Sequence, residues 1–303
     1  MSKTIFVVNP AAGNGRGLEA AEKIDKILQS HYLDADIYLT KGREDAIKYV
    51  SALSYNDYHK VVAVGGDGTV NEVVNGVMLN NDDLAFTVVP VGSGNDFVRM
   101  LNNPENFIEN IKFIVNNNEY KRYDIVKVNY KLSDNKEYPR YFINSLGLGF
   151  DAQVAYIKSI SAGMTGIKAY ILSLLKALKT YKAVKGELIL DDKEKTTFDA
   201  LLMTIGNGIT SGGGFFLNPE AVIDDGILNL TVINFVTRIK ILYKLPLALV
   251  NKLDKVPEAD FYKFEQIEIN LDEPYFIHVD GEVLSTSVES LTATVLKSAI
   301  KIG

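Results

Sequence analysis

The feature that most constrains the fold is a short apolar run that leads directly into a glycine-rich turn. Residues 61–64 (Val-Val-Ala-Val) are typical of a buried strand, and the helical spacing expected after the turn is found at Val70, Val73, Val74 and Val77. Gly65-Gly66-Asp67-Gly68-Thr69 lies between them. A glycine turn from a strand into a helix lets the backbone approach a phosphate group and directs the helix's N–H groups at it.

Asp67 is unexpected in a turn that binds only an anion, because its carboxylate would repel a phosphate. It is understandable if a divalent cation, or the hydroxyl group that attacks the phosphate, lies between the two. The alternative is a tight strand-to-helix turn in which Asp67 or Thr69 only caps the helix.

Two more turns of small residues follow predicted strands. Residues 4–8 lead into Asn9-Pro10 and a loop with three glycines, and a helix from Leu18 has the apolar face Leu18, Ala21, Ile24 and Leu28. This loop has neither the Gly-Lys-Ser/Thr of a P-loop nor Gly-x-Gly-x-x-Gly spacing, and a loop without a ligand is the alternative. Residues 85–90 lead into Gly92-Ser93-Gly94-Asn95-Asp96.

Strands alternating with helices, including a strand at 36–40 and a helix at 44–53, predict a parallel sheet. Because ligands bind at the carboxyl ends of such strands, the turns at Asn9, Gly66 and Gly92 should converge on one edge.

After about residue 122 the pattern changes to short strands separated by turn residues. We expect them at 123–128, 141–144, 186–190, 200–205, 227–232, 266–270, 276–279 and 290–295. A chain of 303 residues is long for one core, so two domains are expected. The predicted fold class is an α/β nucleotide-binding domain with a parallel sheet, followed by a β-sandwich domain.

One helix is expected within the second domain. Its apolar stripe consists of Ile167, Tyr170, Ile171, Leu174, Leu175 and Leu178. Residues 152–186 contain no Asp or Glu but six lysines, in a chain whose formal net charge is −6. A basic amphipathic helix is typical of peripheral membrane contact. The alternative is that the stripe only covers the second sheet while the lysines face solvent.

Composition excludes several other classes. There is no cysteine, and therefore no disulfide framework or thiolate metal site. No apolar run approaches the length of a membrane span, and residues 1–10 do not form a signal peptide. The net charge of −6 argues against nucleic acid as a partner. We therefore expect a cytoplasmic protein in peripheral contact with the membrane.

Two acidic motifs lie near strands of the second half. Asp224-Asp225-Gly226 precedes a strand and by residue type alone needs no ligand. Asp280-Gly281-Glu282 places two carboxylates at a strand end, where Asp-Gly is a common hairpin turn. Such an acidic pair could also act as a base or hold a cation.

Taken together, these motifs resemble the diacylglycerol kinase catalytic-domain family, which includes sphingosine and ceramide kinases and single-chain bacterial lipid kinases. The likeness rests on residues 65–72, Asn9-Pro10, residues 92–97, Tyr123-Asp124, residues 206–214, Asp224-Asp225-Gly226 and Asp280-Gly281-Glu282. It implies an ATP-binding domain at 1–122, completed by 290–303, and a β-rich lipid-binding domain at 123–289.

The resemblance also implies roles for individual residues. ATP would be held by Asn9, Pro10, Ala11, Ala12, Gly13, Thr40, Gly66, Asp67, Gly68, Thr69, Val70, Asn71, Glu72 and Ser93. Asp67, Asp96 and Asp124 would form a water-linked network around the catalytic Mg²⁺. The base would be Asp280 or Glu282, with Asp280 preferred, and a structural Mg²⁺ would bind Val222, Asp225 and Ile227.

The expected reaction is transfer of the γ-phosphoryl group of ATP to a lipid hydroxyl, most simply that of diacylglycerol, which gives phosphatidic acid. Another lipid acceptor remains open, as does a soluble acceptor, since NAD kinases share Gly-Gly-Asp-Gly and a related fold. The alternative from a different class is a non-catalytic membrane-associated regulator. A homodimer is the default expectation for the assembly.

Overall fold

The computed structural model describes residues 3–91, 97–98, 101, 104–134, 136–161, 166–211 and 214–303. The chain forms two compact units. Unit 1 comprises Met1–Tyr123 and Ser298–Gly303, and unit 2 comprises Asp124–Lys297. The end of the chain therefore belongs to the unit in which the chain begins.

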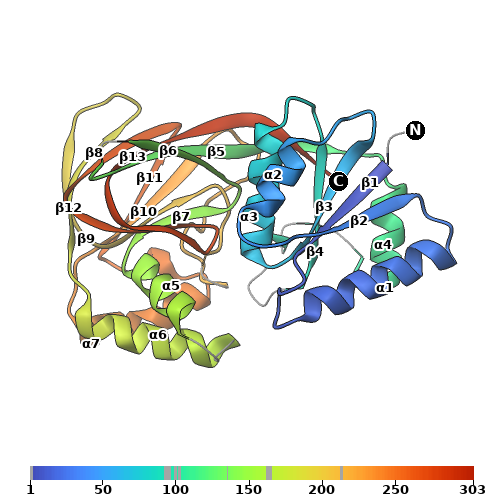
Figure 1. Ribbon diagram of the computed structural model, residues 1–303. Coiled ribbons are helices and arrows are strands. Elements are labelled where there is room, and N and C mark those ends of the chain that lie inside the picture. The colour runs from blue at the N-terminus through green and yellow to red at the C-terminus, as the bar shows by residue number, and fades with distance from the viewer. Residues whose placement is uncertain are drawn as a thin grey trace. The chain divides into compact units, whose positions relative to one another are not determined.

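Unit 1 is an α/β unit built on a parallel sheet (Figure 1). Its strands are β1 (Lys3–Val8), β2 (Ala35–Leu39), β3 (Tyr58–Gly65) and β4 (Ala85–Pro90), and its helices are α1 (Arg16–Ser30), α2 (Asp45–Ser51), α3 (Asp67–Leu79) and α4 (Phe107–Asn116). The strand order is β4-β3-β1-β2, and all three pairings are parallel, which confirms the predicted sheet. Lys301 and Ile302 extend the sheet by pairing in parallel with β4.

Helices cover both faces of this sheet. In Figure 1, α1 and α4 lie on one side of the strands and α2 and α3 on the other. Phe6, Val8, Val62 and Val64 pack with α1 and α4 in one core cluster. The intervening strand residues, Ile5 and Val7 among them, are also buried, which explains why these strands are apolar throughout rather than alternating.

The first helix differs from the prediction in one respect. It begins at Arg16, and Leu18, which was expected on the buried face, is 46% exposed. The buried face consists instead of Ala20, Ala21, Ile24, Ile27 and Leu28, so the predicted stripe is correct from Ala21 onward. Helix α4 was not predicted.

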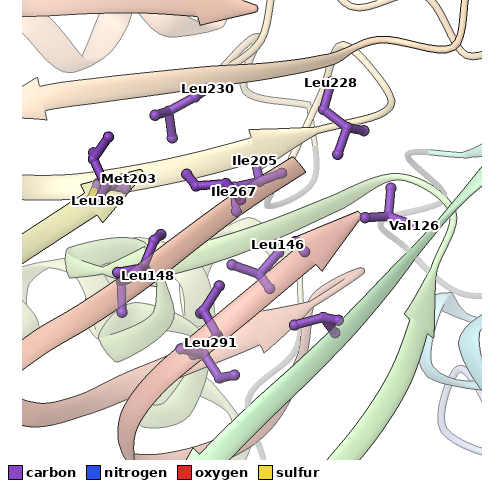
Figure 2. Packing of buried hydrophobic residues seen from close by; sticks show 14 of the residues in the cluster. Val126, Leu146, Leu148, Leu188, Met203, Ile205, Leu228, Leu230, Ile267 and Leu291 are labelled. Carbon is purple, nitrogen blue, oxygen red and sulfur yellow. The ribbon is translucent and has the colours of Figure 1, made fainter. Parts of the chain in front are cut away.

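Unit 2 is a β-sandwich, as predicted. Its strands are β5 (Lys121–Leu132), whose first residues belong to unit 1, β6 (Glu137–Phe142), β7 (Ser145–Gly149), β8 (Val184–Leu190), β9 (Thr196–Gly206), β10 (Leu228–Asn234), β11 (Ala259–Phe264), β12 (Gln266–Val279) and β13 (Glu282–Ile302). The order is β11-β10-β9-β7-β12-β13, with β8 pairing β12 and β9, and β5 pairing β13 and β6. Apolar side chains from all nine strands meet in one core, of which Figure 2 labels Val126, Leu146, Leu148, Leu188, Met203, Ile205, Leu228, Leu230, Ile267 and Leu291.

Three predictions about unit 2 are wrong. The strands expected at 266–270 and 276–279 are a single strand, β12, which continues through a register shift between Asn270 and Tyr275. Of the strand expected at 141–144, only residues 141–142 are in a strand, at the end of β6, and residues 143–144 form the turn before β7. The unit contains three α-helices among its described residues, not one: α5 (Phe150–Ile160), α6 (Gly166–Thr180) and α7 (Arg238–Leu249).

These three helices form a layer on one side of the unit 2 strands (Figure 1), which we call the helical layer. Phe150 and Val154 of α5, Leu174 and Leu178 of α6 and Ile241 of α7 share one core cluster with Leu201 and Leu202 of β9. The helices therefore pack on the sheet through one common apolar interior.

Candidate functional site

The carboxyl ends of the unit 1 strands are tied into one edge by backbone hydrogen bonds. The Asn9 N–H donates to the Val64 carbonyl at 3.0 Å, and the Val91 N–H donates to the Gly65 carbonyl at 2.8 Å. The Thr40 N–H donates to the Val8 carbonyl at 2.9 Å. Asn9, Gly66 and Thr40 are thus brought to one edge of the sheet. Ser93 and Asp96 lie outside the described residues.

Asn9 connects the loop after β1 to helix α3. Its Oδ1 accepts the Ala11 N–H at 3.0 Å, and its Nδ2 donates to the Thr69 hydroxyl at 3.2 Å. Gly13 follows with φ +59°, and a Cβ built on it would lie 2.8 Å from the Val91 carbonyl oxygen. The loop therefore curves closely over the sheet edge, and only glycine fits at residue 13.

Helix α3 begins at this edge without a side-chain cap. Its N-cap is Gly66, whose carbonyl accepts the Val70 N–H at 3.0 Å. The first turn therefore directs backbone N–H groups and a positive dipole end towards the loop of Asn9. Asp67 and Gly68 are half-buried there. Val70 and Asn71 are 4% and 0% exposed, so their side chains lie in the interior and can contribute to a ligand site only through the backbone.

Glu72 fastens the loop that follows β2. Its Oε1 accepts the backbone N–H of Glu44 at 2.9 Å. The Asp45 carboxylate accepts the Lys41 N–H at 2.8 Å and the Tyr38 hydroxyl at 2.9 Å, and these bonds lower the pKa of Asp45. The loop that starts at Thr40 is therefore held at both of its ends. The sequence did not identify Glu44 or Asp45, although an aspartate at a helix start is a recognisable signal.

In unit 2, Asp280 and Gly281 form the two-residue hairpin between β12 and β13. Val279 pairs with Glu282, and Asp280 and Gly281 have φ +48° and +82°. Positive φ at both central residues is the geometry that Asp-Gly favours in hairpins. The predicted hairpin is thus present, with both carboxylates of the motif at one end of the sandwich.

The Asp280 carboxylate is 8% exposed and accepts three backbone N–H groups. Oδ1 accepts those of Asn144 at 2.9 Å and Ser145 at 3.1 Å, and Oδ2 accepts that of Ile143 at 3.2 Å. Glu282, at the start of β13, is exposed. The two carboxylates are therefore in different surroundings: Asp280 is engaged by the backbone, whereas Glu282 lies at the surface.

Asp124 is fixed to the loop at 222–227. It is 1% exposed, its Oδ2 accepts the Gly226 N–H at 2.6 Å, and its own N–H donates to the Ile223 carbonyl at 2.9 Å. Asp225 in the same loop is exposed and accepts the Ile227 N–H at 2.9 Å. The carbonyls of Val222 and Ile227 with the Asp225 carboxylate are an all-oxygen set, which is the ligand type that Mg²⁺ prefers.

The glycine-rich segment after β9 is anchored beside Asp280 through residues that the sequence did not identify. Asn207 is 0% exposed, and its Nδ2 donates to the carbonyls of Asp124 at 3.1 Å and Ile143 at 2.7 Å. The Asn144 side chain donates to the Thr210 carbonyl at 2.7 Å. The sequence showed Asn207 only as part of the glycine-rich segment 206–214, and its burial and its two acceptors are visible only in the structure.

Among the described residues, no three His, Cys, Asp or Glu side chains gather as a metal site. Asp67 belongs to unit 1, Asp124 to unit 2, and Asp96 is outside the described residues. His278 is 2% exposed and lies 3.2 Å from the Asp151 carboxylate, so it is a core histidine. No helix of the described chain combines the length and apolar character needed to cross a membrane.

Comparison with known proteins gives consistent results over nearly the whole chain. Residues 3–128 match the family described as the diacylglycerol kinase catalytic domain. Residues 144–302 match the YegS C-terminal NAD kinase beta sandwich-like domain.

Two curated relatives cover most of the chain. The "Probable lipid kinase YegS-like" of Chromohalobacter salexigens is 30% identical over 87% of this chain and 82% of that protein. The "Diacylglycerol kinase" of Bacillus subtilis is 26% identical over 93% of this chain and 90% of that protein.

Solved structures agree on the fold. A diacylglycerol kinase structure from Bacillus anthracis has a TM-score of 0.75 at 24% identity and covers 99% of this chain and 96% of its own. Yeast NADH kinase complexed with NADH has a TM-score of 0.56 at 11% identity, covering 99% of this chain and 82% of its own. Both show the fold alone.

Proposed function

The chain belongs to the diacylglycerol kinase catalytic-domain family and is an enzyme of the lipid-kinase class. On this premise we propose that it transfers the γ-phosphoryl group of ATP, with Mg²⁺, to the hydroxyl of diacylglycerol and so forms phosphatidic acid. The relatives named diacylglycerol kinase support this choice of acceptor.

The observation that carries the proposal is the sheet edge of unit 1. There Asn9 is hydrogen-bonded to Thr69, so that the loop after β1 and the N-terminus of α3 meet. Backbone N–H groups at a helix start, next to a loop held close by Gly13, are suited to the phosphates of ATP. Thr40 and the loop fastened by Glu72 would contribute to the nucleotide side of the same edge.

The oxygen ligands in this chain suit Mg²⁺. Asp67, at the first position of α3, would act on the metal through water. Bound with ATP, Mg²⁺ neutralises charge on the phosphates. A second, structural Mg²⁺ would bind the carbonyls of Val222 and Ile227 and the carboxylate of Asp225, in the loop that Asp124 holds.

The proton of the lipid hydroxyl would be accepted by Glu282. The sequence favoured Asp280, but both Asp280 oxygens already accept backbone N–H groups. These three bonds hold the Asp280 carboxylate in place at 8% exposure, whereas Glu282 is exposed and can be reached by a substrate. We therefore assign Asp280 to positioning the hairpin and Glu282 to general-base catalysis.

The lipid would be reached by peripheral contact with a membrane. Leu174 and Leu178 of α6 are buried at 4% and 6%, while Leu175 at 44% and the lysines Lys176 and Lys179 are exposed. The predicted stripe thus covers the core in part and also leaves apolar and basic side chains outside, which supports docking on anionic headgroups. Ile167, Tyr170 and Ile171 have no described side chains.

The test is transfer of labelled phosphate from ATP in mixed micelles that contain diacylglycerol, with NAD as a soluble acceptor in a parallel sample. The proposal predicts labelled phosphatidic acid that disappears on chelation of Mg²⁺ and returns when Mg²⁺ is restored. Label in NAD, or transfer that persists after chelation, would contradict it.

A further inference from the structure

Helix α7 is apolar on two opposite sides. Ile241 and Ala248 are buried at 5% and 4% and belong to the core of unit 2. Tyr243 is 84% exposed, Leu249 is 48% exposed, and the capping residue Val250 is 57% exposed. Tyr243 and Val250 are seven residues apart and therefore lie on the same side of the helix. The apolar side of a surface helix is normally buried, and here the side that carries Tyr243 and Val250 is exposed.

The charge around α7 indicates what covers it. Residues 226–253 contain no Asp or Glu and four cations, Arg238, Lys240, Lys244 and Lys252, of which Lys240 and Lys244 are ion-paired with Glu258. Helix α6 lies in the other acid-free stretch, at 152–186, and packs with α7 in one core cluster (Figure 1). In a chain of net charge −6, the helical layer is a local basic and apolar surface. That combination complements an anionic lipid surface rather than a second copy of this acidic chain.

Within the helical layer, α7 exposes mainly apolar side chains, whereas α6 exposes lysines beside apolar side chains. Lys240 and Lys244 of α7 are both ion-paired with Glu258, so the charge of these lysines is largely compensated. What α7 presents outward is apolar and aromatic, and tyrosine favours the boundary between hydrocarbon and water. Helix α6 instead exposes Lys176 and Lys179 beside Leu172 and Leu175.

We propose that α7 is a membrane-inserting element: Tyr243, Leu249 and Val250 enter the interface of an anionic bilayer, beside the headgroup contacts of α6. This inference rests on the proposed function, since it supplies the orientation in which the enzyme would meet its lipid. It assigns the hydrophobic part of membrane binding to a helix that the sequence had not identified.

The experiment measures flotation of the purified full-length protein with vesicles of phosphatidylglycerol and phosphatidylcholine, without ATP or diacylglycerol. The double variant Tyr243→Ser/Val250→Ser should bind about tenfold more weakly, because about half the transfer free energy of two large apolar side chains is lost. The loss should be the same at about 0.1 M and about 0.5 M salt, since apolar contacts are not screened.

The matched control is Tyr32→Ser/Leu79→Ser, which removes a tyrosine at 95% and a leucine at 54% exposure from unit 1. It should bind vesicles as the wild type does, and circular dichroism should show native content for both variants. Unchanged flotation of the α7 variant would overturn the proposal. So would loss of a wild-type dimer in the α7 variant without lipid, which would assign the surface to a second copy.

The binding readout also separates this proposal from the kinase proposal. Vesicle binding that depends on α7 in a protein that transfers no phosphate to diacylglycerol would refute the activity and leave the inserting helix in place. If the protein phosphorylates diacylglycerol but the Tyr243→Ser/Val250→Ser variant floats as the wild type does, the kinase activity stands and the membrane-inserting role of α7 is refuted.

Discussion

The carboxylate of Asp280 accepts the backbone N–H of Asn144 at 2.9 Å, across 136 residues of sequence. The same oxygen accepts the Ser145 N–H, and the other accepts that of Ile143. The Asp280 N–H in turn donates to the Ser145 carbonyl at 2.8 Å. One acidic side chain thus joins the β12–β13 hairpin to the start of β7, and it sets the position from which Glu282 begins β13.

The first prediction concerns this link. Asp280→Asn keeps the size of the side chain, and asparagine tolerates the positive φ of +48°. Its amide nitrogen, however, cannot accept an N–H, so at least one buried donor loses its partner. The free energy of unfolding, measured with urea, should fall by about 1–3 kcal/mol. Unchanged stability with a large loss of turnover would identify Asp280 as the base instead.

The matched variant is Glu282→Gln at the exposed neighbour. Removal of a general base lowers turnover by about 10²–10⁴-fold, and this loss is expected with little change in stability or in KM for ATP. Steady-state phosphorylation of diacylglycerol in mixed micelles gives the turnover. Turnover close to that of the wild type would remove Glu282 from the mechanism.

Thr69→Val tests the connection to Asn9. Valine has the shape of threonine, and residue 69 is 6% exposed, but the acceptor for the Asn9 Nδ2 is lost. Loss of one such bond, about 1–1.5 kcal/mol, should raise KM for ATP about tenfold and leave KM for the lipid unchanged. Thr87→Val is the control, since the Thr87 hydroxyl is buried and has no hydrogen-bond partner among the described residues. An equal effect of both variants would contradict the role of Thr69.

Lys60 predicts a pH dependence of stability. Its ammonium is buried beneath the Tyr120 ring and donates to the carbonyls of Ile114 and Asn117. Burial lowers the pKa of Lys60 from its ordinary value of 10.5 to about 8. Between these two pKa values the unfolded chain binds more protons than the folded chain, so the free energy of unfolding should rise with pH across that window.

Lys60→Met should remove this contribution. The difference between wild type and variant, followed by urea unfolding from about pH 7 to about pH 10, isolates Lys60 from the tyrosines that also titrate there. Below pH 8 Lys60 is charged in the folded wild type, and burial of this cation lowers the free energy of unfolding. Above pH 8 Lys60 loses its proton in the folded chain, so this destabilisation should diminish. Parallel curves for the two proteins would contradict the depressed pKa.

The lysines of α6 predict salt-dependent membrane binding. Lys176→Glu/Lys179→Glu should weaken flotation with phosphatidylglycerol vesicles at least about tenfold at low salt, since each lysine near such a surface contributes about 1 kcal/mol. The effect should shrink as salt is raised. Lys131→Glu/Lys193→Glu changes the net charge equally at exposed sites on the sandwich and should have little effect. An equal loss in both variants would mean that only net charge matters.

Local signals in the sequence were sufficient for the parallel sheet of unit 1, although helix α4 was missed. Glycine turns after apolar strands predicted both the parallel sheet and the shared edge at Asn9 and Gly66, because strand–turn–helix units leave few possible topologies. The bond from Glu72 to Glu44 could not be predicted in the same way. It depends on the path of a loop 28 residues away in the sequence.

The structure of unit 2 was harder to predict from the sequence, because its strand pairings are long-range and antiparallel. Residues 271–274 (Leu-Asp-Glu-Pro) read as a break, yet β12 continues through them with a register shift. Helix α7 contains Pro246 and lacks a one-sided apolar pattern, so periodicity did not reveal it. The carboxylate at Asp280 was found by motif, but its three backbone donors come from a turn that is distant in the sequence, so these contacts could not be predicted.

The central proposal is that this lipid kinase transfers phosphate from ATP to diacylglycerol. The most direct measurement is a competition assay of phosphate transfer. The protein is incubated with labelled ATP, Mg²⁺ and micelles that contain equal amounts of diacylglycerol, monoacylglycerol, ceramide, sphingosine and phosphatidylglycerol. The account predicts that label appears chiefly in phosphatidic acid and that Glu282→Gln abolishes most of it. Label chiefly in another lipid, or in none of them, would contradict it.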